Sequence, residues 1–248
     1  MENSELLKRA EDLRARCEKS SCLTHSLFLT PAEGYELSNW AKYRADCRLL
    51  LFGGQADCER TVAFFLPYYM DEESFDAGEY ISVIRIKAHF GEPTHRDYMG
   101  ALLGMGIGRE WLGDIRVDGS EAWVFCLPSV QAHLLSIEKV GRCGVKTAAC
   151  SLEEVPAAVR KVKEMSFSVM SMRLDAVAAG LFSLSRSECS RQIAAGTVSL
   201  NYQQCFKCDA PVKEGDIISI RGEGTGRITG TGGSSRKGRL FVYGELFR

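Results

Sequence analysis

Arg173-Leu174-Asp175 opens the stretch, residues 173–221, that decides how the C-terminal part of this chain folds. Apolar residues then recur at helical spacing, which predicts a short amphipathic helix through Leu174, Val177, Ala178 and Leu181. Ser185-Arg186-Ser187-Glu188 follows, and the stretch closes with Lys213-Glu214-Gly215-Asp216 and a strand-like apolar run. We find no catalytic constellation within this stretch.

A second helix is predicted to begin after Ser185, because Ser185 and Glu188 have the spacing of a capping box. In this motif the serine oxygen accepts a free backbone N–H, and the glutamate reaches back to the cap. The helix should end at Gly196, since glycine suits the left-handed position after a helix. Cys189 and Ile193 form one stripe of this helix, which should pack on the first helix. Ser187 and Arg191 form another stripe, which should face solvent.

The start of this second helix has the chemistry of an anion-binding surface. Its free N–H groups and its dipole both favour anions, and serine hydroxyls and two arginines lie beside them. Glu188 opposes anion binding unless the cap holds its charge. The alternative is an ordinary solvated helix face, and these residues alone leave both interpretations open.

Four motifs here resemble the alpha-L RNA-binding domain, named for a small-subunit ribosomal protein: Arg173-Leu174-Asp175, Ser185-Arg186-Ser187, Ile193-x-x-Gly196-x-Val198-x-x-Asn201 and Gly215-Asp216-x-Ile218. The resemblance covers residues 171–221 and implies two helices and a turn that clasp folded RNA. By position, it implies RNA contacts from Arg173, Ser185, Arg186, Ser187, Arg191 and Gln192, with Lys207 and Lys213 as weaker candidates.

Basic residues continue beyond these motifs, in the glycine-rich segment 221–227 and in the segment 234–239. We expect further RNA contacts from Arg221, Arg227, Arg236, Lys237 and Arg239, although a flexible hairpin loop is an equal alternative. From residue 166 onward the chain has 11 Lys and Arg against 7 Asp and Glu, whereas its net charge is −1, so residues 1–165 carry −5. The positive charge is concentrated where the RNA motif lies.

The composition is that of an ordinary globular protein: 248 residues, 45% of them hydrophobic and 25% charged. The polar N-terminus has no signal peptide, and no apolar run approaches the ~18 residues of a membrane span, so we expect a cytoplasmic protein without a membrane partner. The ten cysteines are then expected to be reduced, buried thiols. Cys205-x-x-Cys208 lacks a second pair, so neither a metal site nor a cofactor is predicted.

Residues 1–75 are predicted to form a small α+β module. An amphipathic helix should start the chain, and Thr30-Pro31-Ala32-Glu33 has the pattern of a capping box for a second helix. Strands are expected at residues 48–52 and 61–66. A role in structure or partner binding is expected, because no catalytic set of residues is visible.

Residues 76–152 follow a β-α-β-β-α-β order, with strands at 81–88, 115–117, 122–126 and 145–150 and helices at 97–105 and 130–140. This is the split order of ferredoxin-like domains, which RNA-recognition domains share. Trp123 and Phe125 lie on one face of the third strand, where they could stack bases. We favour a role in the core or on a protein-facing surface, because the glycine-aromatic motif of RNA-recognition domains is absent.

The middle stretch 94–115 carries a second, narrower resemblance. Thr94-His95-Arg96-Asp97-x-x-Gly100-Ala101-Leu102-x-Gly104-x-Gly106-Ile107-x-Arg109-Glu110-x-Leu112-Gly113-Asp114-Ile115 resembles the signature of the bacterial YlmH-like proteins. These join an N-terminal module and an RNA-recognition-like domain to a C-terminal alpha-L domain. The resemblance implies binding to the large ribosomal subunit obstructed by peptidyl-tRNA, and rescue of stalled ribosomes through C-terminal tailing of the nascent chain.

We therefore expect an α+β protein with an N-terminal α+β module (1–75), a ferredoxin-like, RNA-recognition-like middle domain (76–152) and an alpha-L RNA-binding domain (166–248). Linkers are expected near 71–78 and 152–165. The second has the pattern of a hinge helix, since Val155, Val159 and Val162 recur at helical spacing. The expected function is that of a non-catalytic factor whose partners are the ribosome and structured RNA, namely large-subunit rRNA and tRNA, with no small-molecule substrate. An RNA-modifying enzyme resembling pseudouridine synthases and a ribosome assembly adaptor are the alternatives.

Overall fold

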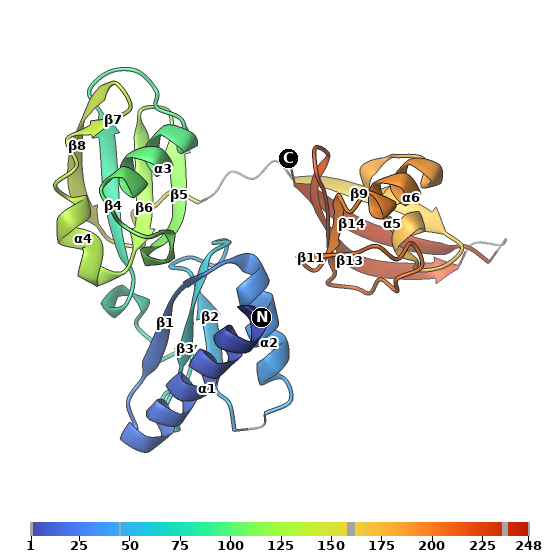
Figure 1. Ribbon diagram of the computed structural model, residues 1–248, viewed down its shortest axis with the longest axis horizontal. Helices are drawn as coiled ribbons and strands as arrows, with labels where there is room; N and C mark the ends of the chain where they lie inside the picture. The colour runs from blue at the N-terminus through green and yellow to red at the C-terminus, as the bar shows by residue number, and fades with distance from the viewer. Residues whose placement is uncertain (1, 45, 158–161, 235–237, 248) are drawn as a thin grey trace. The chain divides into compact units, whose positions relative to one another are not determined.

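The computed structural model describes residues 2–44, 46–157, 162–234 and 238–247 (Figure 1). The chain divides into two compact units, residues 1–158 and 159–248, which we describe separately as unit 1 and unit 2. Both units combine helices with antiparallel sheets, which confirms the predicted α+β class.

The N-terminal part of unit 1 packs two helices on one face of a three-stranded sheet. Its elements are α1 (Glu2–Ser20), β1 (Thr24–Leu29), α2 (Pro31–Ala41), β2 (Leu49–Phe52) and β3 (Thr61–Phe65), and the strand order is β1-β3-β2. Thr30 and Glu33 form the predicted capping box, which explains why α2 begins at Pro31. β1 is absent from the strands predicted above, because its polar residues His25 and Ser26 dilute the apolar alternation.

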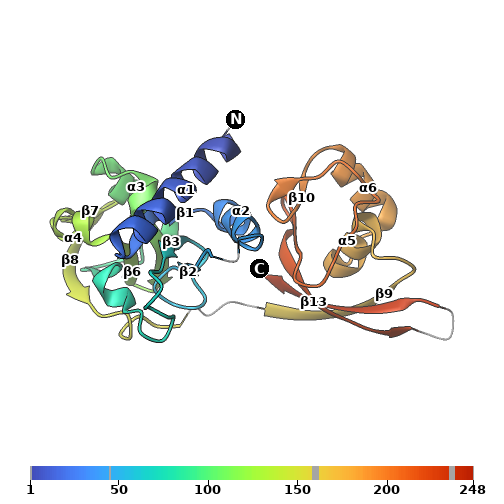
Figure 2. The same ribbon diagram turned by 90° about the horizontal axis from the view of Figure 1, so that it is seen from below.

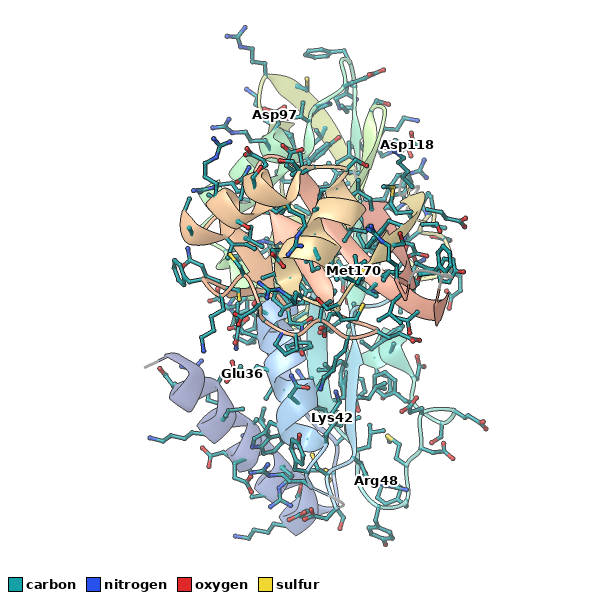
Figure 3. The ribbon with its side chains drawn as sticks, turned by 90° about the vertical axis from the view of Figure 1, so that its right-hand side faces the viewer. Glu36, Lys42, Arg48, Asp97, Asp118 and Met170 are labelled. Atoms are coloured by element: carbon teal, nitrogen blue, oxygen red, sulfur yellow. The ribbon has the colours of Figure 1, made fainter. Side chains whose placement is uncertain are left out.

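The second part of unit 1 has the predicted β-α-β-β-α-β order. It comprises η1 (Ala77–Glu79), β4 (Ser82–Ala88), α3 (His95–Gly104), η2 (Arg109–Trp111), β5 (Leu112–Asp118), β6 (Glu121–Cys126), α4 (Pro128–Leu134), β7 (Lys139–Val140) and β8 (Cys143–Cys150). The antiparallel sheet has the order β5-β6-β4-β8-β7. β6 therefore lies between β5 and β4, and β4 lies between β6 and β8, which is the split arrangement of ferredoxin-like domains. Asp97, labelled in Figure 3, completes a capping box with Thr94 at the start of α3.

The helix expected at residues 130–140 is shorter than predicted. α4 ends at Leu134, and Lys139–Val140 forms a strand that pairs with β8. Gly141, with φ of +58°, makes the turn between these two strands. Leu134, Ile137 and Val140 are all buried, so the helical spacing of the apolar residues reported their burial correctly but not their backbone conformation.

A shared core joins the two sheets of unit 1. Trp123 and Phe125 are buried there, which confirms the favoured interpretation of this pair as core. They belong to one cluster with Phe28, Val62 and Phe64 of the N-terminal sheet. The sheet face on which RNA-recognition domains stack bases is therefore covered by the protein itself.

Residues of the signature at 94–115 also hold the two sheets of unit 1 together. Arg60 donates to the carbonyl oxygens of Phe28 and Leu112 at 3.1 and 3.0 Å, and Asp114 accepts from the backbone N–H groups of Glu59 and Arg60 at 2.8 and 3.0 Å. Arg109 donates to two carbonyl oxygens, those of Leu112 and Gly113, at 2.8 Å each. Burial lowers the pKa of Arg109 to about 10. These contacts give the signature residues a structural role.

Unit 2 packs two helices on a six-stranded antiparallel sheet. Its elements are β9 (Val162–Val169), α5 (Leu174–Phe182), α6 (Arg186–Ala194), β10 (Val198–Leu200), β11 (Gln203–Gln204), β12 (Ile217–Ile220), β13 (Gly224–Ser234) and β14 (Leu240–Phe247). The strand order is β11-β10-β12-β13-β14-β9. Figure 2 shows α5 and α6 on the same side of the ribbon formed by β9 and β13.

Three expectations for unit 2 are corrected. α5 is not amphipathic, because each of its residues except Gly180 is buried. The proposed hinge helix is wrong at Val162, which begins the strand β9; Val159 lies outside the described residues. The segment 224–227 is not a flexible loop, because it pairs with β12 and, from Thr225, with β14 as well. In all three cases the structure depends on contacts between segments that are distant in the sequence, and a local sequence pattern does not reveal such contacts.

We predict that Gly113→Ala destabilises unit 1 by about 1–3 kcal/mol, the usual cost of overpacking a core. A Cβ atom at Gly113 would lie 2.7 Å from Phe28 Cε1 and 2.8 Å from Phe125 Cβ. Urea denaturation measures the change. Gly100→Ala is the matched control, because its Cβ atom meets nothing within 4 Å and alanine favours the helix by about 0.5–1 kcal/mol. Equal stabilities of the two variants would contradict the prediction.

Candidate nucleic-acid interface

The start of α6 presents the serine and arginine groups that the sequence indicated. Ser185 is the N-cap, and its Oγ accepts the backbone N–H of Glu188 at 3.1 Å. Its Oγ also lies 3.0 Å from Ser187 Oγ, so two hydroxyls stand together at the positive end of the helix dipole. The predicted capping box is only half formed, because the Glu188 carboxylate accepts from the side chains of Arg191 and Gln192 instead of returning to the cap.

A buried carboxylate holds two of the predicted RNA contacts in place. Asp175 is 4% exposed and is the one buried charged residue among those described. Arg186 Nη2 donates to Asp175 Oδ2 at 2.5 Å, and Arg173 Nε donates to Asp175 Oδ1 at 3.2 Å. Burial alone would raise the pKa of Asp175, but the bonds from Arg186 and Arg173 outweigh it and hold the pKa below its ordinary 3.8.

Both arginines remain partly exposed while they are held, since 45% of the Arg173 side chain and 59% of the Arg186 side chain are accessible. Asp175 therefore accepts from only some of the N–H groups of each guanidinium and leaves the other N–H donors for a ligand. The sequence motif includes Asp175, but no role is predicted for it above. A single carboxylate among the apolar residues of this helix is the sequence feature that indicates a buried, paired charge.

Arg191 and Gln192 differ in what they can offer to a ligand. The side chain of Arg191 is 75% exposed and pairs with Glu188 one turn earlier on α6. Gln192 is half-buried, and both ends of its amide are engaged, with Nε2 donating to Glu188 at 3.3 Å and Oε1 accepting from Thr197 Oγ1 at 2.5 Å. Arg191 is thus suited to contact a ligand, whereas Gln192 links α6 to the turn that follows.

The other predicted cations are distributed around unit 2. Lys207 and Lys213 are exposed in the segment whose Ala210 carbonyl accepts the backbone N–H of Leu174, at the start of α5. Arg221 follows β12 and Arg227 is exposed on β13. Arg239 donates to the Ser168 carbonyl oxygen at 2.7 Å. Arg236 and Lys237 lie outside the described residues.

Arg186 and Arg239 line the same cavity, although 53 positions separate them in the sequence. The cavity has a volume of about 350 Å³ and lies between the end of β9 and α5. The small residues Ala176, Ala179 and Gly180 form much of its wall. The structure thus brings Arg239 to the cavity beside Arg186 at the start of α6.

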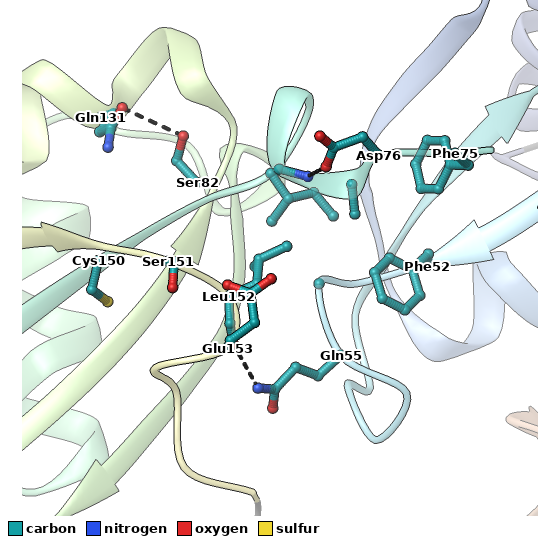
Figure 4. Close-up of a pocket in the computed structure, with 14 residues that line it drawn as sticks. Phe52, Gln55, Phe75, Asp76, Ser82, Gln131, Cys150, Ser151, Leu152 and Glu153 are labelled. Atoms are coloured by element: carbon teal, nitrogen blue, oxygen red, sulfur yellow. Dashed lines mark hydrogen bonds between the residues drawn. The ribbon is translucent and has the colours of Figure 1, made fainter. Parts of the chain in front are cut away.

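A larger cavity, of about 740 Å³, lies in unit 1 (Figure 4). Asp76 accepts the backbone N–H of Gly78 at 2.8 Å, and Gln55 donates to the Leu152 carbonyl oxygen at 2.9 Å. Burial raises the pKa of the Cys150 thiol in its wall. The described lining pairs no nucleophile with a general base.

The Cys189 thiol is also part of the packed core instead of a reactive site. Burial raises the pKa of Cys189 on α6 to about 11, so this thiol stays protonated at neutral pH. Across the residues described, no group of three or more His, Cys, Asp and Glu side chains could hold a metal ion. The described helices also include none that is long and apolar enough to cross a membrane.

We predict that Asp175→Asn lowers the free energy of unfolding of unit 2 by about 2 kcal/mol at pH 7, the scale of lost hydrogen bonds to charged groups. The folded-state pKa of Asp175 is depressed, so its contribution is present above the unfolded value near 3.8 and is lost as the pH falls through the folded value. Denaturation at pH 7 and in acid should therefore show a difference between wild type and variant that shrinks in acid. The exposed Asp209→Asn is the control; a matching loss there would contradict the assignment.

Comparisons with known proteins find a matching family model, a related protein and a similar solved structure. A family model described as "Putative RNA-binding domain in YlmH" matches residues 73–154. A Bacillus subtilis (strain 168) protein named "Ribosome-associated protein quality control protein P2" is 30% identical over 220 residues, covering 88% of this chain and 85% of the relative. The solved structure "Cell division protein ylmH from Streptococcus pneumoniae" has a TM-score of 0.51 at 22% identity, covering 63% of this chain and 96% of that one, and shares the fold. The chain belongs to the YlmH family, as its signature at residues 94–115 predicted.

Proposed function

We propose that this protein is a non-catalytic, cytoplasmic RNA-binding factor that acts in ribosome-associated quality control. It binds the large ribosomal subunit, contacting rRNA and peptidyl-tRNA, and helps to rescue stalled ribosomes. The printed name of the Bacillus subtilis relative supports association with the ribosome and a role in quality control. The finer assignment to the large subunit and to peptidyl-tRNA rests on the resemblance of the middle and C-terminal motifs.

The arginine pair on Asp175 is the observation that carries this proposal. A phosphate that binds at the start of α6 would meet guanidinium groups already held in position, so less side-chain entropy is lost on binding. The Ser185 and Ser187 hydroxyls and the helix N-terminus add donors at the same place. Donors of this kind recognise backbone phosphates, so the shape of the RNA selects the site.

The mechanism follows from differential binding. A factor without catalytic groups acts by binding one state of the ribosome more tightly than the others, which shifts the population towards that state. The state proposed here is the large subunit that carries peptidyl-tRNA. A preference for this particle is therefore the property to measure.

We predict that Arg186→Ala combined with Arg191→Ala weakens binding to such large subunits by about 1–3 kcal/mol, the scale of lost charge-assisted contacts. Co-sedimentation across a salt series measures the affinity, which should also become less dependent on salt. Arg191→Ala alone should give part of the loss while leaving both partners of Asp175 intact.

Arg9→Ala is the matched control, since Arg9 is an exposed arginine that pairs with Glu5 on α1 of unit 1. Unchanged affinity of a folded double variant would overturn the site assignment. Equal binding of the wild type to free subunits, whole ribosomes and obstructed subunits would favour an assembly adaptor. Binding to none of them would favour an enzyme acting on isolated RNA.

We also predict that Glu188→Gln strengthens RNA binding a few-fold, by about 0.3–1 kcal/mol. The Glu188 carboxylate pairs with Arg191 and adds negative charge beside the proposed phosphate site. Removing its charge therefore frees the Arg191 guanidinium and ends the repulsion between the carboxylate and the phosphate. The same co-sedimentation at low salt tests this, with the stability of α6 followed by circular dichroism. Weaker binding by a stable variant would show that phosphates do not approach this face.

A further inference from the structure

The outer face of the sheet in unit 2, opposite α5 and α6, carries two exposed aromatic side chains. Phe241 and Tyr243 on β14 are 40% and 46% exposed, whereas Val242 between them is fully buried in the core under the helices. The alternation of a strand therefore places both rings on the solvent side of the sheet, about 7 Å apart along β14. In Figure 2, both helices lie on the other side of this sheet.

Glycines on the neighbouring strand shape the position of the Tyr243 ring. A Cβ atom at Gly232 would lie 3.0 Å from Tyr243 Oη and 3.1 Å from its Cε2, and one at Gly230 would lie 4.0 Å from its Cδ2. One edge of the ring thus runs along β13, over backbone that bears no side chain. The ring therefore leans across the sheet towards β13, while Tyr243 remains exposed.

Small polar residues flank the rings on the other side. In the register of β14 and β9, Phe241 lies opposite Ser168 and Tyr243 lies opposite Ser166. Arg239, two residues before Phe241, reaches the edge strand β9, where it donates to the Ser168 carbonyl oxygen and lines the cavity that it shares with Arg186. Glu164 and Glu245 face each other beyond Tyr243 and mark the opposite end.

We propose that Phe241 and Tyr243 form a platform on which unpaired RNA bases stack, distinct from the phosphate site at α6. Two exposed rings on alternate positions of an antiparallel strand are the arrangement with which RNA-recognition domains stack bases. At one end, Arg239 at the edge of β9 would receive backbone phosphates between the platform and the cavity that it shares with Arg186. At the other end, Glu164 and Glu245 limit the platform to about two bases. This inference rests on the proposed function, since it assigns a second contact to the same RNA-binding unit.

The surroundings favour a nucleic acid over a protein partner. A stable protein interface buries about 800 Å² on each side around an apolar centre. Here the residues directly beside the two rings are Ser166, Ser168, Gly230 and Gly232, which add little apolar area to that of the rings. Stacking uses the ring faces alone and needs no wider apolar surface.

The test compares the full chain with the variant F241L/Y243L by fluorescence anisotropy, on an RNA hairpin with and without an unpaired oligouridine extension. Leucine keeps apolar volume but has no aromatic face. We expect about tenfold weaker binding to the extended hairpin and unchanged binding to the plain hairpin. The exchanged pair F241Y/Y243F, which keeps both rings, should bind like the wild type. F90L/Y43L, which replaces one exposed phenylalanine and one exposed tyrosine of unit 1, is the matched control.

Crosslinking gives a direct readout. With iodouridine in the extension, photocrosslinks should map to Phe241 or Tyr243 by mass spectrometry. Wild-type affinity of F241L/Y243L for the extended hairpin, or crosslinks confined to other residues, would overturn the platform. Arg191→Ala separates this outcome from failure of the proposed function: it should weaken binding to both hairpins, and if neither hairpin binds the wild type, the RNA-binding proposal itself fails.

Discussion

The pairing of Asp175 with Arg173 and Arg186 connects the fold of unit 2 to its proposed chemistry. A carboxylate buried in the first turn of α5 must be compensated, and its two partners come from the N-cap of α5 and the first turn of α6. The same contacts therefore set how the two helices meet and where their guanidinium groups project. A group that packs the domain also organises the surface that we propose for RNA.

The two units use one architecture with opposite consequences for binding. Each packs helices on one face of an antiparallel sheet. In unit 1 the other face of the larger sheet is covered, because Trp123 and Phe125 join a core with Phe28 and Phe64. In unit 2 the corresponding face leaves Phe241 and Tyr243 exposed. The family model assigns an RNA-binding domain to residues 73–154, so any RNA contact of that domain must use another of its surfaces.

Local signals explain which elements were predictable. Thr30 with Glu33 at α2, the glycine stop at Gly196 and the β-α-β-β-α-β order all depend on neighbours in the chain, and all are present in the structure. Predictions failed where other partners compete: Val162 was expected in a helix, but it pairs with the distant Phe247 in the sheet. Glu188 was expected at its cap, but Arg191 and Gln192 offer it charge-assisted and amide donors on the same helix.

The sequence by itself determined the α+β class, the order of most elements, the position of the basic region and the family, because capping motifs, apolar periodicity and signature spacing are written within short stretches. Tertiary structure alone decided which arginines share a carboxylate, that Phe241 and Tyr243 remain exposed and that Arg239 lines the same cavity as Arg186. These properties depend on segments far apart in the chain, and burial and charge pairing act between surfaces that meet only after folding.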